Sequence, residues 1–121
     1  MIRRVATAAA ACSVLLTTGC GDCAGVGRPA FEVTVVDARS GASIADSAVV
    51  YVFEHPELTR VDSATYQYFP GRIWTLDRGG TFNVVVERPG YYPWTTENRK
   101  VKRECSTETV FLVARLVRRD A

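Results

Sequence analysis

The chain has 121 residues, of which 47% are hydrophobic and 23% are charged, and its formal net charge is +2. This composition allows one globular domain and excludes a disordered chain or a second domain of ordinary size. A net charge of +2 is too small to indicate binding to nucleic acid.

The N-terminal segment has the pattern of an export signal. Arg3 and Arg4 supply positive charge, and residues 5–18 are uncharged and mostly apolar or small. This run is shorter than the roughly 20 apolar residues that a membrane-spanning helix needs. It ends in Leu-Thr-Thr-Gly-Cys at residues 16–20, which resembles the end of a bacterial lipoprotein signal, in which small residues precede a lipidated cysteine. The resemblance implies a cleaved signal over residues 1–19 and a lipid on Cys20.

Two alternatives remain for this segment, namely cleavage by an ordinary signal peptidase and retention as an uncleaved anchor. Cys12 is a second candidate for lipidation, but it would leave a much shorter apolar run. The lipoprotein hypothesis predicts a location in the cell envelope, where the lipid holds the chain to a membrane on the periplasmic or the cell-surface side. Residues 20–30 are rich in glycine and are expected to form a flexible tether.

From residue 31 onward, apolar residues alternate with a period of two, which predicts strands and not helices. Six or seven strands are predicted. The clear ones are residues 31–36, 48–53, 81–87 and 109–116, and the weaker ones are residues 59–62, 72–76 and 91–96. The second strand is apolar on both faces and should be central in its sheet. Turn residues over 37–41, 77–80 and 88–90 separate the strands, and one helical turn is expected within 43–47 or 56–59. The pattern predicts an all-β sandwich or small barrel.

Two motifs carry a family resemblance. A strand ending in Asp-x-x-Ser-Gly at residues 37–41 precedes a second strand, and Gly-x-Phe-x-Val-x-Val-x-x-x-Gly-Tyr follows at residues 80–91. This order resembles carboxypeptidase regulatory-like domains, and the closing Val110-x-Leu112 run is similar to their last strand. The resemblance covers Phe31 to Val117 and implies a seven-stranded, transthyretin-like (prealbumin-like) Greek-key β-sandwich, expected over residues 31–118. The motifs consist of strand and turn residues, so they imply little about function.

The cysteines have separate expected fates. Cys12 would leave with the signal and Cys20 would carry lipid, so Cys23 and Cys105 remain. Two thiols in an exported domain usually pair, and we therefore expect a Cys23–Cys105 disulfide. A metal site is not expected, because His55 is the only histidine and cannot complete a ligand set with two cysteines.

Catalysis has little support in the sequence. The chain has no His-Glu-x-x-His motif, no Gly-x-Ser-x-Gly motif and no phosphate-binding loop. Hydroxyisourate hydrolases, which are enzymes of the transthyretin-like superfamily, carry several histidines and a terminal Tyr-Arg-Gly-Ser, whereas this chain ends in Arg-Arg-Asp-Ala at 118–121. We therefore expect a non-enzyme without a cofactor, and an enzyme of that superfamily is a distant alternative.

Aromatic residues give the main binding hypothesis. The Tyr91-Tyr92-Pro93-Trp94 cluster either packs against the core and edge of the sandwich or forms a ligand-stacking surface with Trp74. Related starch-binding-like sandwiches stack sugar rings on Trp and Tyr, so a carbohydrate-binding module is the alternative to a binding or structural module for an unknown envelope protein.

Residues 99–103 are strongly basic and are interpreted as the solvated flank of an edge strand, with polyanion contact as the alternative. A monomer is expected.

Overall fold

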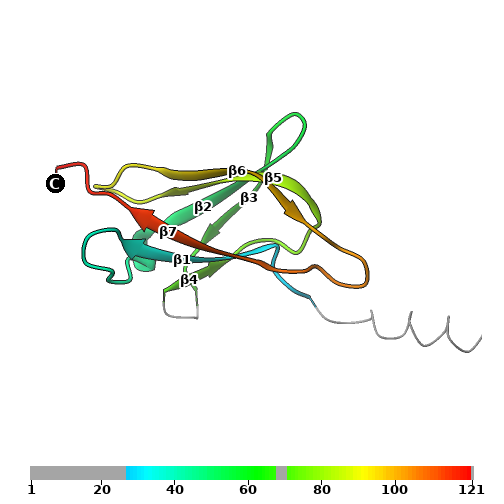
Figure 1. Cartoon of the computed structure of the whole chain (residues 1–121), viewed down its shortest axis with the longest axis horizontal. Coiled ribbons are helices and arrows are strands. Elements are labelled where there is room, and N and C mark those ends of the chain that lie inside the picture. Colours follow the sequence, from blue (N-terminus) through cyan, green and yellow to red (C-terminus); the bar gives the residue numbers. More distant parts are fainter. Residues whose placement is uncertain (1–26, 68–70, 121) are drawn as a thin grey trace, which may run out of the picture.

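The computed structural model describes residues 27–67 and 71–120. The predictions for the signal, for Cys12, Cys20 and Cys23, and for the first part of the tether lie outside the described residues. These residues form seven strands and one short 3₁₀ helix, and Figure 1 shows the strands in two layers. The elements are β1 (Phe31–Asp37), η1 (Ala45–Ser47), β2 (Val49–Glu54), β3 (Thr59–Thr65), β4 (Arg72–Trp74), β5 (Gly80–Glu87), β6 (Trp94–Val101) and β7 (Val110–Leu116).

The strands form two sheets, and the predicted all-β class is confirmed for the described residues. One sheet has the order β4-β1-β7, and the other has the order β3-β2-β5-β6. The first and last strands are parallel neighbours, since β1 pairs with β7 over its whole length from Phe31–Val110 to Asp37–Leu116. The remaining ladders are antiparallel. As predicted, β2 is a central strand, between β3 and β5.

The core lies between the two sheets and follows the alternation of the sequence. Every second residue of β1 is buried, beginning with Phe31. The ring of Phe31 meets the ring of Phe82 edge to face, with centroids 5.8 Å apart and an interplanar angle of 82°. Phe82 and its neighbours Val84 and Val86 on β5 are fully buried. These side chains belong to the core that the two sheets bury between them.

The observed sixth strand differs from the prediction. The period-two pattern predicts residues 91–96, whereas β6 spans Trp94–Val101. Pro93 has no N–H group to donate to a ladder, so regular pairing starts only after it. The charged residues up to Lys100 obscure the strand in the sequence, but they are exposed on an edge of the sheet. The predicted helical turn is present as η1.

The two ends of the sandwich are built by different segments. At the end that we call the tether end, residues 27–30 lie against the β4–β5 and β6–β7 loops: the Arg28 N–H donates to Asp77, and the Thr109 hydroxyl donates to the carbonyl of Pro29. At the opposite end of β1, which we call the arginine end, residues 37–41, 88–92 and 116–119 meet. The seven residues of β1 separate these ends by about 20 Å.

Asp77 joins three segments at the tether end. Besides the Arg28 N–H, it accepts a hydrogen bond from the buried Thr107 hydroxyl and faces Arg103 at 3.6 Å. The Thr107 hydrogen bond is the main cause that lowers the pKa of Asp77, although partial burial opposes it.

Within the described residues, the structure contains no helix of the length and apolar character needed to cross a membrane.

Candidate functional site

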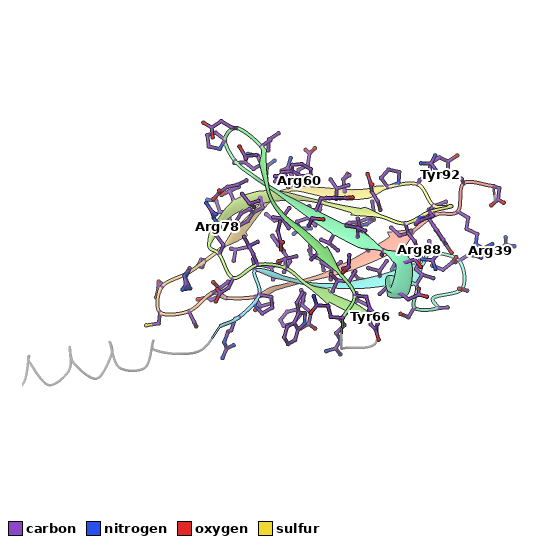
Figure 2. The ribbon with its side chains drawn as sticks, turned by 180° about the vertical axis from the view of Figure 1, so that it is seen from behind. Arg39, Arg60, Tyr66, Arg78, Arg88 and Tyr92 are labelled. Atoms are coloured by element: carbon purple, nitrogen blue, oxygen red, sulfur yellow. The ribbon has the colours of Figure 1, made fainter. Side chains whose placement is uncertain are left out.

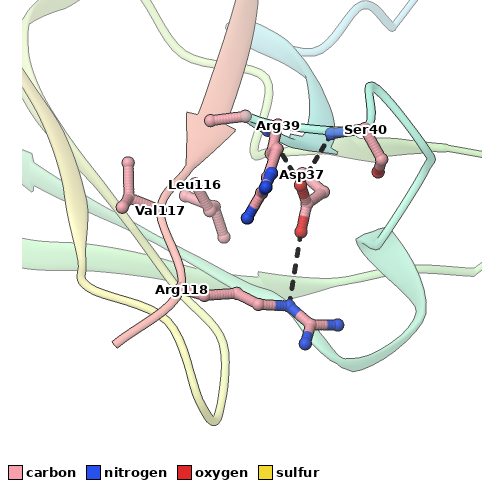
Figure 3. Close-up of a pocket in the computed structure, with 7 residues that line it drawn as sticks. Asp37, Arg39, Ser40, Leu116, Val117 and Arg118 are labelled. Carbon is pink, nitrogen blue, oxygen red and sulfur yellow. Dashed lines mark hydrogen bonds and ion pairs between the residues drawn. The ribbon is translucent and has the colours of Figure 1, made fainter. Parts of the chain in front are cut away.

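A cavity of about 500 Å³ lies at the arginine end. It opens between the turn after β1 and the end of β7, as Figure 3 shows. Its lining residues are Asp37, Ala38, Arg39, Ser40, Leu116, Val117 and Arg118. The cavity therefore combines an apolar floor with one carboxylate and two guanidinium groups.

Asp37 is the structural centre of this end. Its Oδ1 accepts hydrogen bonds from the backbone N–H groups of Arg39 and Ser40, at 2.8 and 2.9 Å. Its Oδ2 accepts a hydrogen bond from the Tyr91 hydroxyl, with the two oxygens 2.7 Å apart, and lies 3.6 Å from Nε of Arg118. The Ser40, Tyr91 and Arg39 donors, with Arg118, lower the pKa of Asp37 to about 2. The carboxylate is therefore ionised and fully engaged, so it does not serve as a proton donor near neutral pH.

The two arginines of the cavity have different roles. Nε of Arg118 donates to the Tyr91 hydroxyl at 3.3 Å, and contact with Tyr91 and Asp37 raises the pKa of Arg118. The guanidinium of Arg39 has no ion pair or hydrogen bond within the described part of the chain. Figure 3 shows these two side chains on either side of Asp37. Because Asp37 balances Arg118, Arg39 leaves one net positive charge in the cavity.

Two further arginines stack on tyrosines beside the cavity. The guanidinium of Arg88 lies 5.4 Å from the centroid of the Tyr91 ring, and that of Arg119 lies 4.9 Å from the centroid of the Tyr92 ring. Figure 2 shows Arg88 and Tyr92 at the same end of the sandwich as Arg39. Arg88 also forms an ion pair with Asp46 at 3.3 Å. The Arg119–Tyr92 contact joins the C-terminal segment to the 88–92 turn, whereas the Arg88–Tyr91 contact lies within that turn.

The aromatic residues predicted as a ligand-stacking surface are not brought together. Trp74 lies on β4 opposite Glu32, near the tether end, and its Nε1 donates to Glu32 Oε1 at 3.0 Å. Tyr91 is buried against the core, Trp94 is half-buried, and Tyr92 is half-exposed at the arginine end. Trp74 is level with the start of β7, with β1 between them, whereas the Tyr92 N–H donates to the Val117 carbonyl just past the end of β7. A single aromatic surface of four residues is therefore absent from this arrangement.

The remaining predicted groups fall at the other end of the molecule. His55 Nε2 is hydrogen-bonded to Asn83 Oδ1 at 2.7 Å, and neither residue lies in the cavity. Arg99 and Lys100 are exposed on β6, an edge strand as expected. Cys105, in the β6–β7 loop, is disulfide-bonded, but its predicted partner Cys23 lies outside the described residues, so the pairing stays a prediction. No group of three or more potential metal ligands occurs in residues 27–67 and 71–120.

Comparison with known proteins adds no further constraint: no family model matches the chain, and no curated protein matches it.

The arginine-lined cavity was not predicted from the sequence. The Asp-x-x-Ser-Gly motif predicts the turn at Asp37, but no sequence motif links this turn to Arg118 and Arg119. Their proximity depends on the parallel pairing of β1 with β7, which brings the ends of both strands together.

Proposed function

We propose that this chain is an exported lipoprotein whose sandwich is a non-catalytic binding module of the carboxypeptidase regulatory-like, transthyretin-like type. Seven strands in two sheets support the proposed fold family. The observation that carries the function is the position of Arg39, whose unpaired guanidinium lines an open cavity with an apolar floor at the end farthest from the tether. A cavity of this kind suits a ligand that joins an anionic group to a small apolar group.

The anchoring part of the proposal places lipid on Cys20 and a disulfide between Cys23 and Cys105. Cys23 precedes Gly27 by only four residues, which span at most about 14 Å. The next residue, Arg28, bonds Asp77, which in turn bonds Thr107, two residues beyond Cys105. This short path along the chain supports the proposed pairing of Cys23 with Cys105, and such a bridge would fix the tether at one end of the sandwich.

The anchor is tested by the intact mass of the protein extracted from the membrane fraction. We expect a chain that begins at Cys20 and carries acyl groups, and a Cys20→Ser variant that loses them. An unmodified N-terminus downstream of Cys20 would refute the lipid anchor. Alkylation of the unreduced protein tests the bridge, since free labelling of both Cys23 and Cys105 would contradict it.

Binding at the cavity is predicted to depend on Arg39. With short aliphatic carboxylates as probes, we expect saturable chemical-shift changes at Ala38, Leu116 and Val117, and no such changes with the corresponding neutral amides. Arg39→Gln should weaken binding about tenfold or more, since it removes the charge-assisted hydrogen bond. The matched control is Arg99→Gln, which removes an exposed arginine from β6 at the other end of the molecule. Equal binding of carboxylate and amide would contradict the proposal.

A carbohydrate-binding module remains the alternative, and the exposure of two aromatic rings favours it. Trp74 is 46% exposed on the outer face of its sheet, and Tyr92 is 49% exposed. Quenching of tryptophan fluorescence by oligosaccharides would support this alternative if Trp74→Ala abolished it. The absence of any response across a glycan array would eliminate it.

A further inference from the structure

Strand β7 has a strand neighbour on one side only within the described residues, namely β1. The N–H of Val110 donates to Ala30, and the carbonyl of Leu116 accepts from Ala38, so the even-numbered residues of β7 direct their backbone groups to β1. Because successive residues alternate in this direction, the backbone groups of Phe111, Val113 and Arg115 point to the open edge. The carbonyl of Val117 points to the same side, but it already accepts from Tyr92.

The other edge strands carry features that hinder pairing with another chain. Strand β4 has only three residues, and the ladders that bind β3 and β6 to their sheet each contain a register shift. Strand β6 also carries the charged residues Glu97, Arg99 and Lys100. In contrast, β7 keeps an uninterrupted seven-residue register and has Arg115 as its only charge. Short length, irregular register and charge are the usual means of protecting edges, and β7 has the least of this protection.

The outward side chains of β7 are apolar and accessible. Phe111 is 70% exposed, Val113 is 51% exposed, and Val117, just after the strand, is 53% exposed. Trp74 lies on the same face two strands away, because Glu32 pairs with both Trp74 and Phe111. This face gathers four of the six large exposed hydrophobic residues among those described. Such a concentration beside an unpaired edge indicates an interaction surface.

We propose that the occupant of this edge is a second copy of the same chain, paired antiparallel along β7 about a two-fold axis at Val113. Val113 then lies opposite Val113 of the second copy, and Phe111 lies opposite Arg115 of the second copy, in both directions. All three open residues of each strand exchange backbone hydrogen bonds in this register. The pairing replaces the monomer expected from the sequence, and it is independent of the anion cavity.

Two features favour this register: the backbone groups of β7 that have no partner in the monomer, and the charges that come to face each other. A two-fold axis one residue further, at Ala114, would pair Phe111 with Val117, whose carbonyl is already occupied by Tyr92. With the axis at Val113, Leu116 meets Val110, where β7 of the second copy begins, and the occupied Val117 is not needed. The guanidinium of Arg115 then faces the exposed Phe111 ring of the second copy, which is a favourable cation–π arrangement, and no two like charges are opposed.

The test measures the mass of the full-length protein in detergent by sedimentation velocity as its concentration rises. We expect wild-type protein to convert from monomer to dimer. Val113→Lys and Val113→Glu should each raise the dissociation constant about tenfold or more, because each places like charges opposite one another at the axis. An equimolar mixture of these two variants should regain the dimer, because lysine then faces glutamate.

Leu58→Lys is the matched control, since Leu58 is 45% exposed in the β2–β3 loop and its replacement should leave the dimer unchanged. Thermal unfolding checks that the Val113 variants stay folded, which their half-exposed position favours. A wild-type chain that stays monomeric at all concentrations would overturn the proposal. It would also be overturned by a dimer that is insensitive to Val113→Lys, or by a mixture that fails to restore pairing.

Discussion

Replacing Phe82 with alanine is expected to lower the free energy of unfolding by about 3–5 kcal/mol. Phe82 is fully buried, and its ring packs edge to face against Phe31 on the opposite sheet. The substitution removes this contact between the two sheets and leaves a cavity in the core. In a domain of this size, each kcal/mol corresponds to about 4–8 °C in melting temperature. Urea unfolding followed by circular dichroism measures the loss.

Two control substitutions separate packing across the core from general sensitivity of the sheet. Phe82→Leu retains most of the volume and should cost clearly less than alanine. Phe53→Ala removes the same side chain from a half-buried position on β2, so its cost should also be smaller. If Phe53→Ala destabilised the protein as much as Phe82→Ala, the assignment of the core to the Phe31–Phe82 contact would be wrong.

Tyr91→Phe is expected to cost about 1–2 kcal/mol near neutral pH, even though the ring and its packing are retained. The buried Tyr91 hydroxyl donates a hydrogen bond to Asp37 and accepts one from Arg118. Its removal therefore leaves the Asp37 carboxylate and the Arg118 guanidinium each with one hydrogen-bond partner fewer. Tyr92→Phe is the matched control, because the Tyr92 hydroxyl makes only a long contact of 3.5 Å with an exposed carbonyl. Chemical denaturation of both variants gives the comparison.

The same contact predicts a dependence on pH. The pKa of Asp37 is about 2 in the folded protein against an ordinary value of 3.8, so the ionised carboxylate stabilises the fold fully above about pH 4. This contribution is lost as the pH falls from about 4 toward 2, because the carboxylate takes up a proton. Tyr91→Phe removes one cause of the lowered pKa, so the difference between wild type and variant should shrink over that range. A constant difference from pH 7 to pH 2 would contradict the assignment.

The sequence predicted the fold well where alternation was strict. Val33 and Val35 on β1, and Phe82 and Val84 on β5, are buried as their alternation with polar residues predicted. The sequence predicted the bounds of β6 poorly. Pro93 interrupts the predicted strand, and the charged residues after Pro93 do not show the alternation of a half-buried strand. Local alternation reports which face a residue occupies, but the length of an edge strand depends on a ladder with a distant neighbour.

The candidate site was harder to predict, because its residues come from segments far apart in the sequence. Asp37 was recognised as a turn residue, and its role as acceptor for Tyr91 and partner for Arg118 required the folded chain. Trp74 and Tyr92 were grouped by residue type, yet they lie near opposite ends of β7. Aromatic residues in one sequence share a surface only if strand order brings them to the same end.

The parallel pairing of β1 with β7 has a mechanical consequence. A pull between the residues that precede β1 and the far end of β7 acts in opposite directions along two parallel strands. The force therefore loads all the hydrogen bonds of the β1–β7 ladder in shear at once, whereas pulling a hairpin apart breaks them one after another. A domain built in this way withstands tension along the line joining its tether end to its arginine end.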